Sequence, residues 1–410
     1  MKESSLLLIV VLCVSCSTSK KSASPAEVQL SEAMKRESSA PMLQHLVISE
    51  DNLISYSSKA KTPPVIKLFD EKVSYHYTSI DIGSQVPVEC FIYSSQVNPA
   101  LTLKSFSANA LANEQIKGGV KERSITFFGS GAIGNSPYLI LNTSYKTGEE
   151  NVGYLKSMIG IRQQGAVVCL HNEVGYNQTF IQRFAEVITT LSFSQMPEVK
   201  PLYSDIMLLM MENFPMGFVT NHVFEGKDKN KTWISRSSLL FPNPKMEVTT
   251  YDNTEFEITN EKGKLIQGRY NLENDLKESH SLEINQIKGK EYHVKGFHNH
   301  KYISSKVSTD GILSRLKHTM MVPQKLFKEG LRHFSIPIYT PEENVFAPVQ
   351  LRTSVKEINP NGAIVRIETK DVISTAVVDK EGMIEEISVP AGPSKITGKR
   401  IYKEGSLDKK

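Results

Sequence analysis

The chain has 410 residues, of which 40% are hydrophobic and 22% are charged, and its formal net charge is +4. This length suffices for about two domains, and the composition is that of a water-soluble globular protein. The basic residues are scattered among acidic ones, without a long basic run, which argues against a nucleic-acid-binding surface.

The first feature along the chain is a short apolar segment, Leu6–Val14, followed by Ser15 and Cys16. A membrane-spanning helix needs about 20 apolar residues, whereas the core of a signal peptide needs about 7–15. Cys13-Val14-Ser15-Cys16 resembles the lipobox of bacterial lipoproteins, where the leader is cut before a cysteine that carries the lipid. The resemblance implies a signal peptide over residues 1–15 and acyl chains, such as palmitate, on Cys16. The alternative is an ordinary secreted protein that is cut elsewhere.

Residues 16–64 are expected to form a flexible, lipid-anchored tether. The segment after Cys16 is rich in serine and lysine, and the tether ends at Pro63-Pro64. The resemblance also implies a location, because Ser17 after the lipidated cysteine suits sorting to the outer membrane. We therefore expect a protein of the cell envelope that faces the periplasm.

Residues 65–197 are predicted to form an α+β domain, an α/β sandwich with helices on one face of a sheet. Segments rich in β-branched and aromatic residues predict strands over 86–94, 124–128, 138–142 and 165–170. Helices are predicted over 104–117 and over 179–191, where apolar residues recur every third or fourth position. The pattern loosely resembles the small α+β domains of the PsbP and Mog-type fold.

Two cysteines remain in the body of the chain, Cys90 and Cys169, once Cys13 leaves with the leader and Cys16 carries lipid. An even pair in an oxidising compartment favours a disulfide. Such a bridge would close a loop of roughly 79 residues and contribute roughly 4.5 kcal/mol in the loop-entropy model. The alternative is two buried free thiols.

Residues 198–405, after a seam at Pro197–Pro201, are predicted to form a β-rich antiparallel domain. Val349–Lys356 alternates apolar and polar residues, which predicts a strand with one buried face. The same alternation occurs over 255–259, 282–287, 292–297, 364–369, 374–378 and 383–388. Glycine-containing turns separate the strands, and two hairpins, 256–266 and 376–384, share one pattern. A helix is predicted over 312–328, interrupted at Pro323.

This antiparallel meander with one helix resembles the half-barrel periplasmic domains of the LolA and LppX lipoprotein families. The resemblance implies a sheet curled around an apolar cavity that holds a lipid or acyl chain. It rests on the pattern alone, so that no binding residue is carried over to this chain.

Three motifs were weighed as sites. Gly129–Gly134 fits the dinucleotide pattern G-x-G-x-x-G, but a strand follows where a helix must begin, which favours a turn between strands. His298 and His300 would share one face, the geometry of half a metal site, if the backbone is extended, but surface histidines in a loop are the favoured interpretation. His171 lies close to Cys169, which acts as a nucleophile only if it is reduced.

The sequence therefore assigns no catalytic, cofactor-binding or metal-ligating residue and indicates no cofactor. It favours a lipid-anchored envelope protein with a non-enzymatic binding or structural role. The expected partners are the membrane, through the lipid anchor, and a lipid or another envelope protein. An envelope hydrolase with dispersed catalytic residues and a protein-interaction scaffold are the alternatives.

Overall fold

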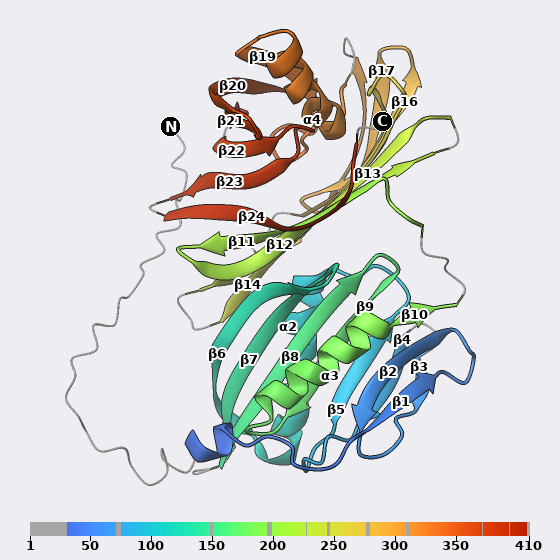
Figure 1. Cartoon of the computed structure of the whole chain (residues 1–410), viewed down its shortest axis with the longest axis vertical. Helices are drawn as coiled ribbons and strands as arrows, with labels where there is room; N and C mark the ends of the chain where they lie inside the picture. Colours follow the sequence, from blue (N-terminus) through green and yellow to red (C-terminus); the bar gives the residue numbers. More distant parts are fainter. Residues whose placement is uncertain are drawn as a thin grey trace, which may run out of the picture. The chain divides into compact units, whose positions relative to one another are not determined.

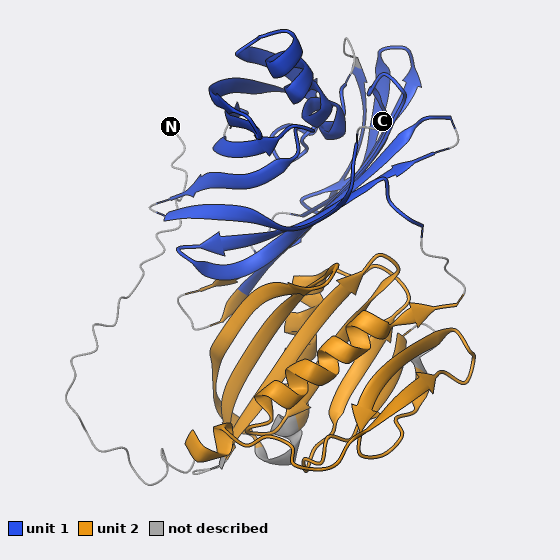
Figure 2. Cartoon of the chain, in the orientation of Figure 1, with its two compact units in different colours: residues 1–7, 199–240, 249–410 blue, residues 8–198, 241–248 orange. Residues whose placement is uncertain are grey.

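The computed structural model describes residues 31–70, 75–147, 151–194, 199–226, 228–243, 247–275, 279–308, 312–370, 372–392 and 394–407. The predicted signal peptide and Cys16 lie outside the described residues. The described residues divide into two compact units (Figure 2). Unit 2 takes those within Leu8–Glu198 and Phe241–Val248, and unit 1 takes those within Val199–Leu240 and Thr249–Lys410. Among them, no helix is both long and apolar enough to span a membrane.

Unit 2 is built on a seven-stranded antiparallel sheet with the order β3-β4-β5-β9-β8-β7-β6. Its strands are β3 (Ile66–Asp70), β4 (Tyr75–Ile80), β5 (Val88–Tyr93), β6 (Val120–Ile133), β7 (Ser136–Thr147), β8 (Asn151–Arg162) and β9 (Gly165–Asn172). Helices α2 (Pro99–Gly118) and α3 (Asn177–Thr190) cover its two faces (Figure 1). Ser107 of α2 contacts Ser157 of β8, whereas Phe184 of α3 packs at Gly160, which points to the opposite face of β8.

A smaller sheet lies beside α3 and consists of β1 (Leu43–Ile48), β2 (Ile54–Ala60) and β10 (Ser192–Phe193) (Figure 1). Tyr56 of β2 and Phe184 of α3 belong to one hydrophobic core. The expected tether over 16–64 is therefore wrong for residues 43–60. β1 and β2 pair with each other, but the elements that β2 packs on, α3 and β10, lie about 130 residues further along the chain, so that the local sequence does not reveal them.

The folded part of unit 2 begins before β1. The carboxylate of Glu37 accepts hydrogen bonds from the backbone N–H groups of Gln178 and Thr179, at 2.8 and 2.9 Å. Because the first N–H groups of a helix have no partner within it, Glu37 caps α3 from a distant part of the sequence.

The structure joins Cys90 of β5 to Cys169 of β9 by a disulfide. The two residues lie opposite each other in the antiparallel ladder, and neither is exposed. The bridge therefore crosses two central strands of the seven-stranded sheet, inside the core that α3 covers.

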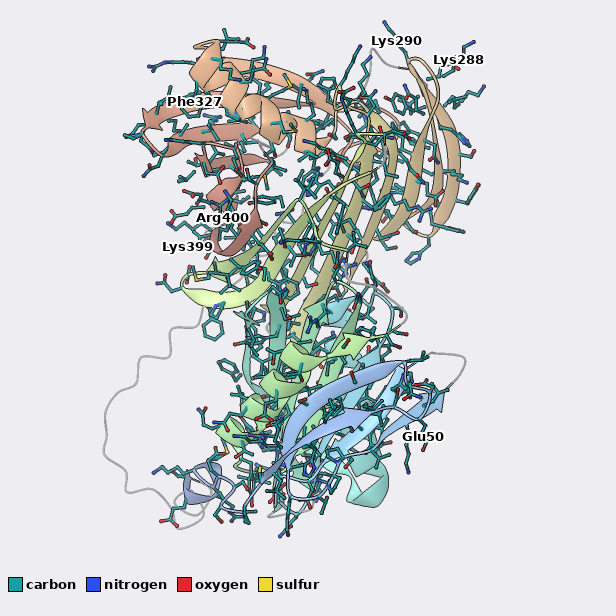
Figure 3. The ribbon with its side chains drawn as sticks, turned by 45° about the vertical axis from the view of Figure 1, so that its right-hand side comes forward. Glu50, Lys288, Lys290, Phe327, Lys399 and Arg400 are labelled. Carbon is teal, nitrogen blue, oxygen red and sulfur yellow. A yellow bond between two sulfur atoms is a disulfide. The ribbon has the colours of Figure 1, made fainter. Side chains whose placement is uncertain are left out.

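Unit 1 is a fourteen-stranded antiparallel sheet with the order β18-β17-β16-β15-β14-β13-β12-β11-β24-β23-β22-β21-β20-β19. Its strands are β11 (Tyr203–Met211), β12 (Phe214–Glu225), β13 (Lys231–Pro242), β14 (Val248–Thr259), β15 (Leu265–Asn274), β16 (Ser279–Lys288), β17 (Glu291–His298), β18 (Lys301–Ser308), β19 (His333–Ile338), β20 (Val349–Asn359), β21 (Gly362–Glu368), β22 (Ile373–Asp379), β23 (Ile384–Ala391) and β24 (Ser394–Gly405). Charged side chains stand at its hairpin tips, as Lys288 and Lys290 show (Figure 3).

Helix α4 (Arg315–Pro323) and the π-helical turn η1 (Gln324–Lys328) fill the inside of this curved sheet (Figure 1). Leu316 packs with Tyr203 at one end of the helix, and Val322 packs with Val365 and Ala376 at the other. The helix therefore contacts strands that lie far apart in the sheet order.

The two hairpins with a shared sequence pattern have the same turn. In each, the glycine N–H donates to a carbonyl three residues earlier, Gly263 to Asn260 at 2.8 Å and Gly382 to Asp379 at 2.9 Å. Both glycines have positive φ, 77° and 83°. Both also lie against α4, where a Cβ atom would meet helix atoms. Glycine is therefore required for the backbone angle and for the close approach.

The fold class expected from the sequence, α+β with an α/β sandwich, is wrong, because the described chain is mainly strand, with large antiparallel sheets and few helices. Strands β6 and β7 of unit 2 extend far beyond the segments 124–128 and 138–142 that predicted them. The two strands pair from Val120–Thr147 to Ile133–Ser136. Strands pair through their backbone N–H and C=O groups, which polar and apolar residues share. A search for apolar segments therefore misses the polar parts of a strand.

Candidate functional site: a buried acid–imidazole cluster in unit 1

Strand β14 turns its acidic side chains inward. Glu255 and Glu257 are only 6% and 1% exposed, whereas Phe256 and Ile258, which alternate with them, are half-buried. Successive residues of a strand point to opposite faces, so the two carboxylates lie on one face. This arrangement reverses the usual one, in which the apolar residues of an alternating strand are the buried ones.

Two neighbouring elements hold Glu257. The backbone N–H of Arg315, the first residue of α4, donates to Glu257 Oε2 at 3.0 Å. The hydroxyl of Tyr270, on β15, donates to Glu257 Oε1 at 2.9 Å. Both oxygens are therefore occupied, and Glu257 places a negative charge at the N-terminus of α4, which stabilises the helix.

Glu255 is held less completely. Its Oε1 atom lies 3.1 Å from Arg315 Nη1 and accepts a hydrogen bond from Asn253 Nδ2 at 3.2 Å. The same Asn253 Nδ2 donates to Glu342 Oε1 at 3.4 Å. Asn253 therefore bridges two carboxylates, one on β14 and one in the loop after β19.

Two histidines complete the group. His280 Nε2, on β16, lies 4.0 Å from Glu342 Oε1, and the rings of His280 and His298 stack with centroids 6.3 Å apart. We call these side chains the acid–imidazole cluster: Asn253, Glu255, Glu257, Tyr270, His280, His298, Arg315 and Glu342.

Several buried polar atoms of the cluster lack a hydrogen-bond partner among the described residues. They are Asn253 Oδ1, Glu255 Oε2, His280 Nε2, His298 Nδ1 and Arg315 Nε. More than nine in ten buried polar groups of native proteins find a partner, so a concentration of unpaired atoms at one place calls for an explanation.

Burial sets the ionisation of the cluster. It raises the pKa of Glu255 to about 7, with Arg315 opposing the shift and Glu342 and Glu257 adding to it. Burial likewise raises the pKa of Glu257 and lowers the pKa of His280. Near neutral pH, Glu255 is therefore divided between its protonated and ionised forms.

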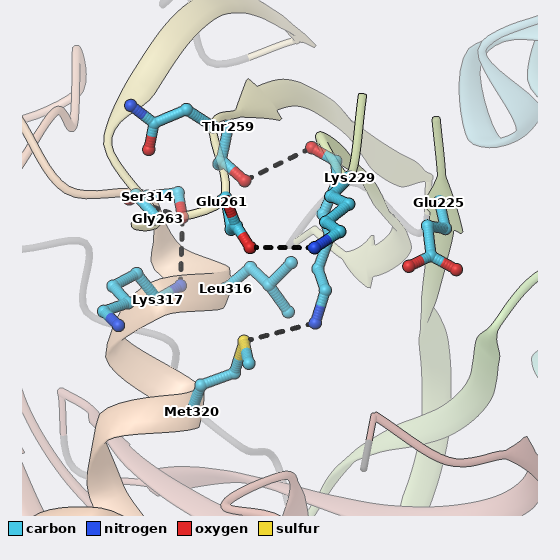
Figure 4. Close-up of a pocket in the computed structure, with 11 residues that line it drawn as sticks. Glu225, Lys229, Thr259, Glu261, Gly263, Ser314, Leu316, Lys317 and Met320 are labelled. Carbon is cyan, nitrogen blue, oxygen red and sulfur yellow. Dashed lines mark hydrogen bonds and ion pairs between the residues drawn. The ribbon is translucent and has the colours of Figure 1, made fainter. Parts of the chain in front are cut away.

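The cluster reaches solvent through two of its members, because the side chains of Arg315 and Glu342 are 29% and 28% exposed. A pocket of about 220 Å³ adjoins it at the start of α4 (Figure 4). Its lining consists mainly of charged and polar residues: Glu225, Lys229, Lys231, Thr259, Asn260, Glu261, Gly263, Ser314, Leu316, Lys317 and Met320. Arg315, which contacts Glu255, lies between two of these lining residues in the sequence.

The pocket is shaped by contacts among its own lining (Figure 4). Ser314 caps α4 by accepting a hydrogen bond from the Lys317 N–H at 2.9 Å, and Lys229 pairs with Glu261 at 3.4 Å. A second pocket of about 550 Å³ lies over β19, β20 and β21, and its lining includes Arg352, Arg366 and Glu368. Both pockets therefore present charged and polar side chains together with apolar surface.

The structure does not place His298 and His300 on one strand face. Strand β17 ends at His298, and His300 lies in the following turn with a φ of 63°. His293 contacts Ser304 and takes no part in the cluster. Across the described residues, no three His, Cys, Asp or Glu side chains are placed to hold a metal ion.

The other two motifs belong to the framework of unit 2. Gly129–Gly134 lies at the end of β6 and in the turn to β7, as the strand after it predicted. His171 Nε2 contacts the Val86 carbonyl at 3.1 Å, and Glu173 accepts the Val86 N–H at 3.1 Å. Both residues hold one loop of unit 2, and Cys169 is oxidised.

Sequence reasoning missed the members of the cluster other than His298. The available signal was Glu255-Phe256-Glu257, two acids at alternate positions of a predicted strand. That alternation does not tell which face is buried, so it gave no reason to place the acids inside.

No protein-family model matches the chain, and no curated protein matches it. Six solved chains are similar to it. One is the crystal structure of a beta-barrel-like protein of domain of unknown function DUF1849 from Brucella abortus, with a TM-score of 0.41 and 11% sequence identity. The similarity covers 51% of this chain and 100% of that one.

Proposed function

We propose that this chain is a lipid-anchored cell-envelope protein, held through Cys16 in the outer membrane and facing the periplasm, whose unit 1 binds a small polar ligand without chemical turnover. The anchor follows from the lipobox-like sequence before Cys16. The ligand would occupy the acid–imidazole cluster and extend toward the pocket beside α4.

One observation supports the binding role above the others. Five unpaired buried atoms lie together in the cluster, Glu255 Oε2, Asn253 Oδ1 and His280 Nε2 among them, whereas the other eight are spread over the two units of the described chain. A buried polar atom without a partner loses about 1–3 kcal/mol relative to one that is paired. A ligand that supplies the missing partners would recover this free energy on binding.

The half-barrel families that the sequence resembles hold lipids or acyl chains, which need an apolar cavity. The pockets described in unit 1 are lined mainly by charged and polar side chains. We therefore propose a polar ligand in place of the acyl chain that the resemblance implies.

An envelope hydrolase is the second candidate, and the ionisation of Glu255 favours it. A carboxyl group with a pKa of about 7 is able to give and take a proton at neutral pH. A hydrolase requires turnover, so incubation with a library of envelope-derived esters and glycosides separates the two candidates. If the wild-type protein releases product from one of these compounds and the Glu255→Gln variant does not, the enzymatic role would replace the binding role.

The anchor is tested in cells that express the full chain. Labelling with an alkyne fatty acid should tag the wild-type protein and leave the Cys16→Ser variant untagged. The tagged protein should fractionate with the outer membrane. Absence of any tag on the wild-type chain would rule out the anchor.

The binding role is tested by native mass spectrometry of the full-length protein purified from its host. A co-purifying small molecule that is absent from the Glu255→Gln variant supports ligand binding by unit 1. A second protein chain in its place indicates a scaffold. A bare chain whose stability no compound of a metabolite library raises contradicts the binding role.

A further inference from the structure

We propose that the ligand of the acid–imidazole cluster is an organic cation, bearing a primary ammonium or guanidinium group, that Glu255, Glu342 and His280 hold together. This inference rests on the proposed binding role of unit 1 and specifies the chemical class of its ligand.

The charges of the cluster are the first argument. It gathers three carboxyl groups, Glu255, Glu257 and Glu342, around one guanidinium group, that of Arg315. Glu255 and Glu257 are almost completely buried, where a charge needs a partner. When its carboxyl groups are ionised, the cluster has more negative than positive charge, and a bound cation would restore the balance.

The hydrogen-bonding capacity of the unpaired atoms is the second argument. Asn253 Oδ1, and Glu255 Oε2 when Glu255 is ionised, only accept hydrogen bonds, and the Nδ2 side of Asn253 is fixed by the carboxylates on either side of it. Among the unpaired atoms of the cluster's described residues, only Arg315 Nε is always a hydrogen-bond donor. An ammonium group, with three donors and no acceptor, matches this excess of acceptors.

His280 is the third argument and is independent of the carboxylates. Its side chain is buried, 5% exposed as a residue, and its Nε2 atom points to Glu342 without reaching hydrogen-bond distance, at 4.0 Å. The imidazole is neutral because burial lowers its pKa, so Nε2 is able to accept a hydrogen bond from a third group.

A metal ion is the other cation to consider. Among the described residues, no group of three potential ligand side chains is placed to hold one. Ammonium and guanidinium groups need hydrogen-bond acceptors at about 2.8–3.0 Å but require no fixed coordination geometry. An Asn, a His and two Glu side chains from different elements are able to provide such acceptors.

Binding of the cation should compete with the proton on Glu255. The titratable groups that face Glu255 are Arg315 on α4, Glu257 on its own strand, Tyr270 on β15 and Glu342 in the loop after β19. Of these, only Arg315 favours the ionised form, so burial and the two acids hold the pKa near 7. Affinity for the cation should therefore rise with pH, by about 30-fold from pH 5.5 to pH 8.

The test uses the full-length Cys16→Ser chain, which lacks the lipid, in isothermal titration calorimetry. The probes are n-butylamine, agmatine and spermidine, with n-butanol as the uncharged isostere. We expect the amines to bind and the alcohol to fail, with the pH dependence above. Equal binding of butylamine and butanol, or tighter binding of amines at pH 5.5, would overturn the inference.

Variants locate the site. Glu255→Gln and Glu342→Gln should each weaken amine binding at least tenfold. Glu283→Gln is the matched control, because Glu283 lies on the outer face of the same sheet and pairs with Arg269 and Lys295. The fluorescence of Trp233, the single tryptophan of the chain, verifies that each variant is folded. Amine binding that none of the cluster variants alters would place the cation elsewhere.

A further titration distinguishes two sources of the cation, a free amine and a side chain of a partner protein. A lysine-rich peptide that binds while free amines do not would identify a partner protein's side chain as the ligand.

The failure of this inference is distinct from the failure of the proposed function. A neutral or anionic molecule bound to the wild-type protein and lost from Glu255→Gln contradicts the cation and leaves the binding role intact.

Discussion

Unit 1 contains two clusters of buried charged side chains, and they differ in how completely they are paired. The first is the acid–imidazole cluster. The second, which we call the Asp379 network, consists of Tyr203, Asp205, Asn221, Asp379, Glu381, Glu385, Arg400 and Lys403. Both clusters lie close to one of the two equivalent glycine turns that pack against α4.

In the Asp379 network, the protein's own side chains and backbone supply the partners of the Asp379 carboxylate. Asp379 Oδ2 lies 2.9 Å from Arg400 Nη1 and 3.0 Å from Lys403 Nζ, while its Oδ1 accepts the Glu381 and Met383 N–H groups. In the acid–imidazole cluster, by contrast, Glu255 Oε2 has no partner among the described residues.

The difference indicates different roles. Asp379, with both carboxylate oxygens paired, holds strands β22 and β24 together, and Glu381 Oε2, which accepts no hydrogen bond from the described residues, lies 3.1 Å from Lys403 Nζ. A cluster with several unpaired buried atoms is complete only when something else binds. Burial and charge alone, which the two clusters share, do not distinguish a structural network from a ligand site.

Breaking the Asp379 network should give the largest effect. Arg400→Met leaves Asp379 and Glu385 without their guanidinium partner, and removal of one member of a buried ion pair costs about 3–5 kcal/mol. Denaturant unfolding followed by Trp233 fluorescence measures the loss. Lys399→Met, at the adjacent and exposed position in Figure 3, should change stability by less than about 1 kcal/mol. Equal losses in the two variants would contradict a structural role for the network.

Glu255→Gln should give the next largest effect, with a pH dependence of definite sign. Burial raises the pKa of folded Glu255 from 4.5 to about 7, so the unfolded chain ionises first as pH rises. The wild-type protein therefore loses stability relative to the variant between about pH 4.5 and pH 7, by up to about 3 kcal/mol.

The measurement is the free energy of unfolding of both proteins at pH 5 and pH 8. The variant should gain on the wild type as pH increases, because glutamine carries no proton to lose. A difference between the two proteins that stays the same at both pH values would show that Glu255 titrates normally.

The two glycine turns should respond unequally to alanine. Both substitutions force a positive φ on a residue with a side chain, which costs about 1–2 kcal/mol. At Gly382 the new Cβ would also lie 2.1 Å from the main-chain oxygen of Thr319, whereas at Gly263 it would meet the flexible side chain of Lys317. Gly382→Ala should therefore lower the unfolding midpoint more than Gly263→Ala, and the reverse order would contradict the rigid packing of α4 on that turn.

The smallest effect is expected at the surface of the pocket. Lys229 and Glu261 form an ion pair with side chains 74% and 70% exposed. Solvent and salt screen such pairs, so Glu261→Gln should change stability by less than about 1 kcal/mol. A larger loss in the same unfolding assay would show that exposed charges matter here as much as buried ones.

The elements of the second half of the chain were accessible to sequence reasoning. Val349–Lys356 alternates clearly, and in β20 the structure buries Leu351, Thr353 and Val355 while Gln350 and Arg352 stay exposed. The shared hairpin pattern around Gly263 and Gly382 also corresponds to one turn. These features depend on local patterns of a few residues.

The features that sequence reasoning missed depend on distant contacts. Strands β1 and β2 are stabilised by α3, and the cap of α3 comes from Glu37. The inward orientation of the Glu255 side chain depends on Arg315, which lies 60 positions further along the chain. A strand with an acidic buried face is stable only beside such a partner, and local patterning contains no information about it.

The proton on Glu255 provides the most direct test of this account. We propose following the side-chain carboxyl carbons by ¹³C NMR on glutamate-labelled protein, with Glu255→Gln as the assignment control. We expect a titration midpoint near pH 7 for Glu255, which falls by at least about one unit when butylamine saturates the site. A midpoint near 4.5 in the free protein, or one that butylamine leaves unchanged, would contradict a buried carboxyl group that exchanges its proton for a bound cation.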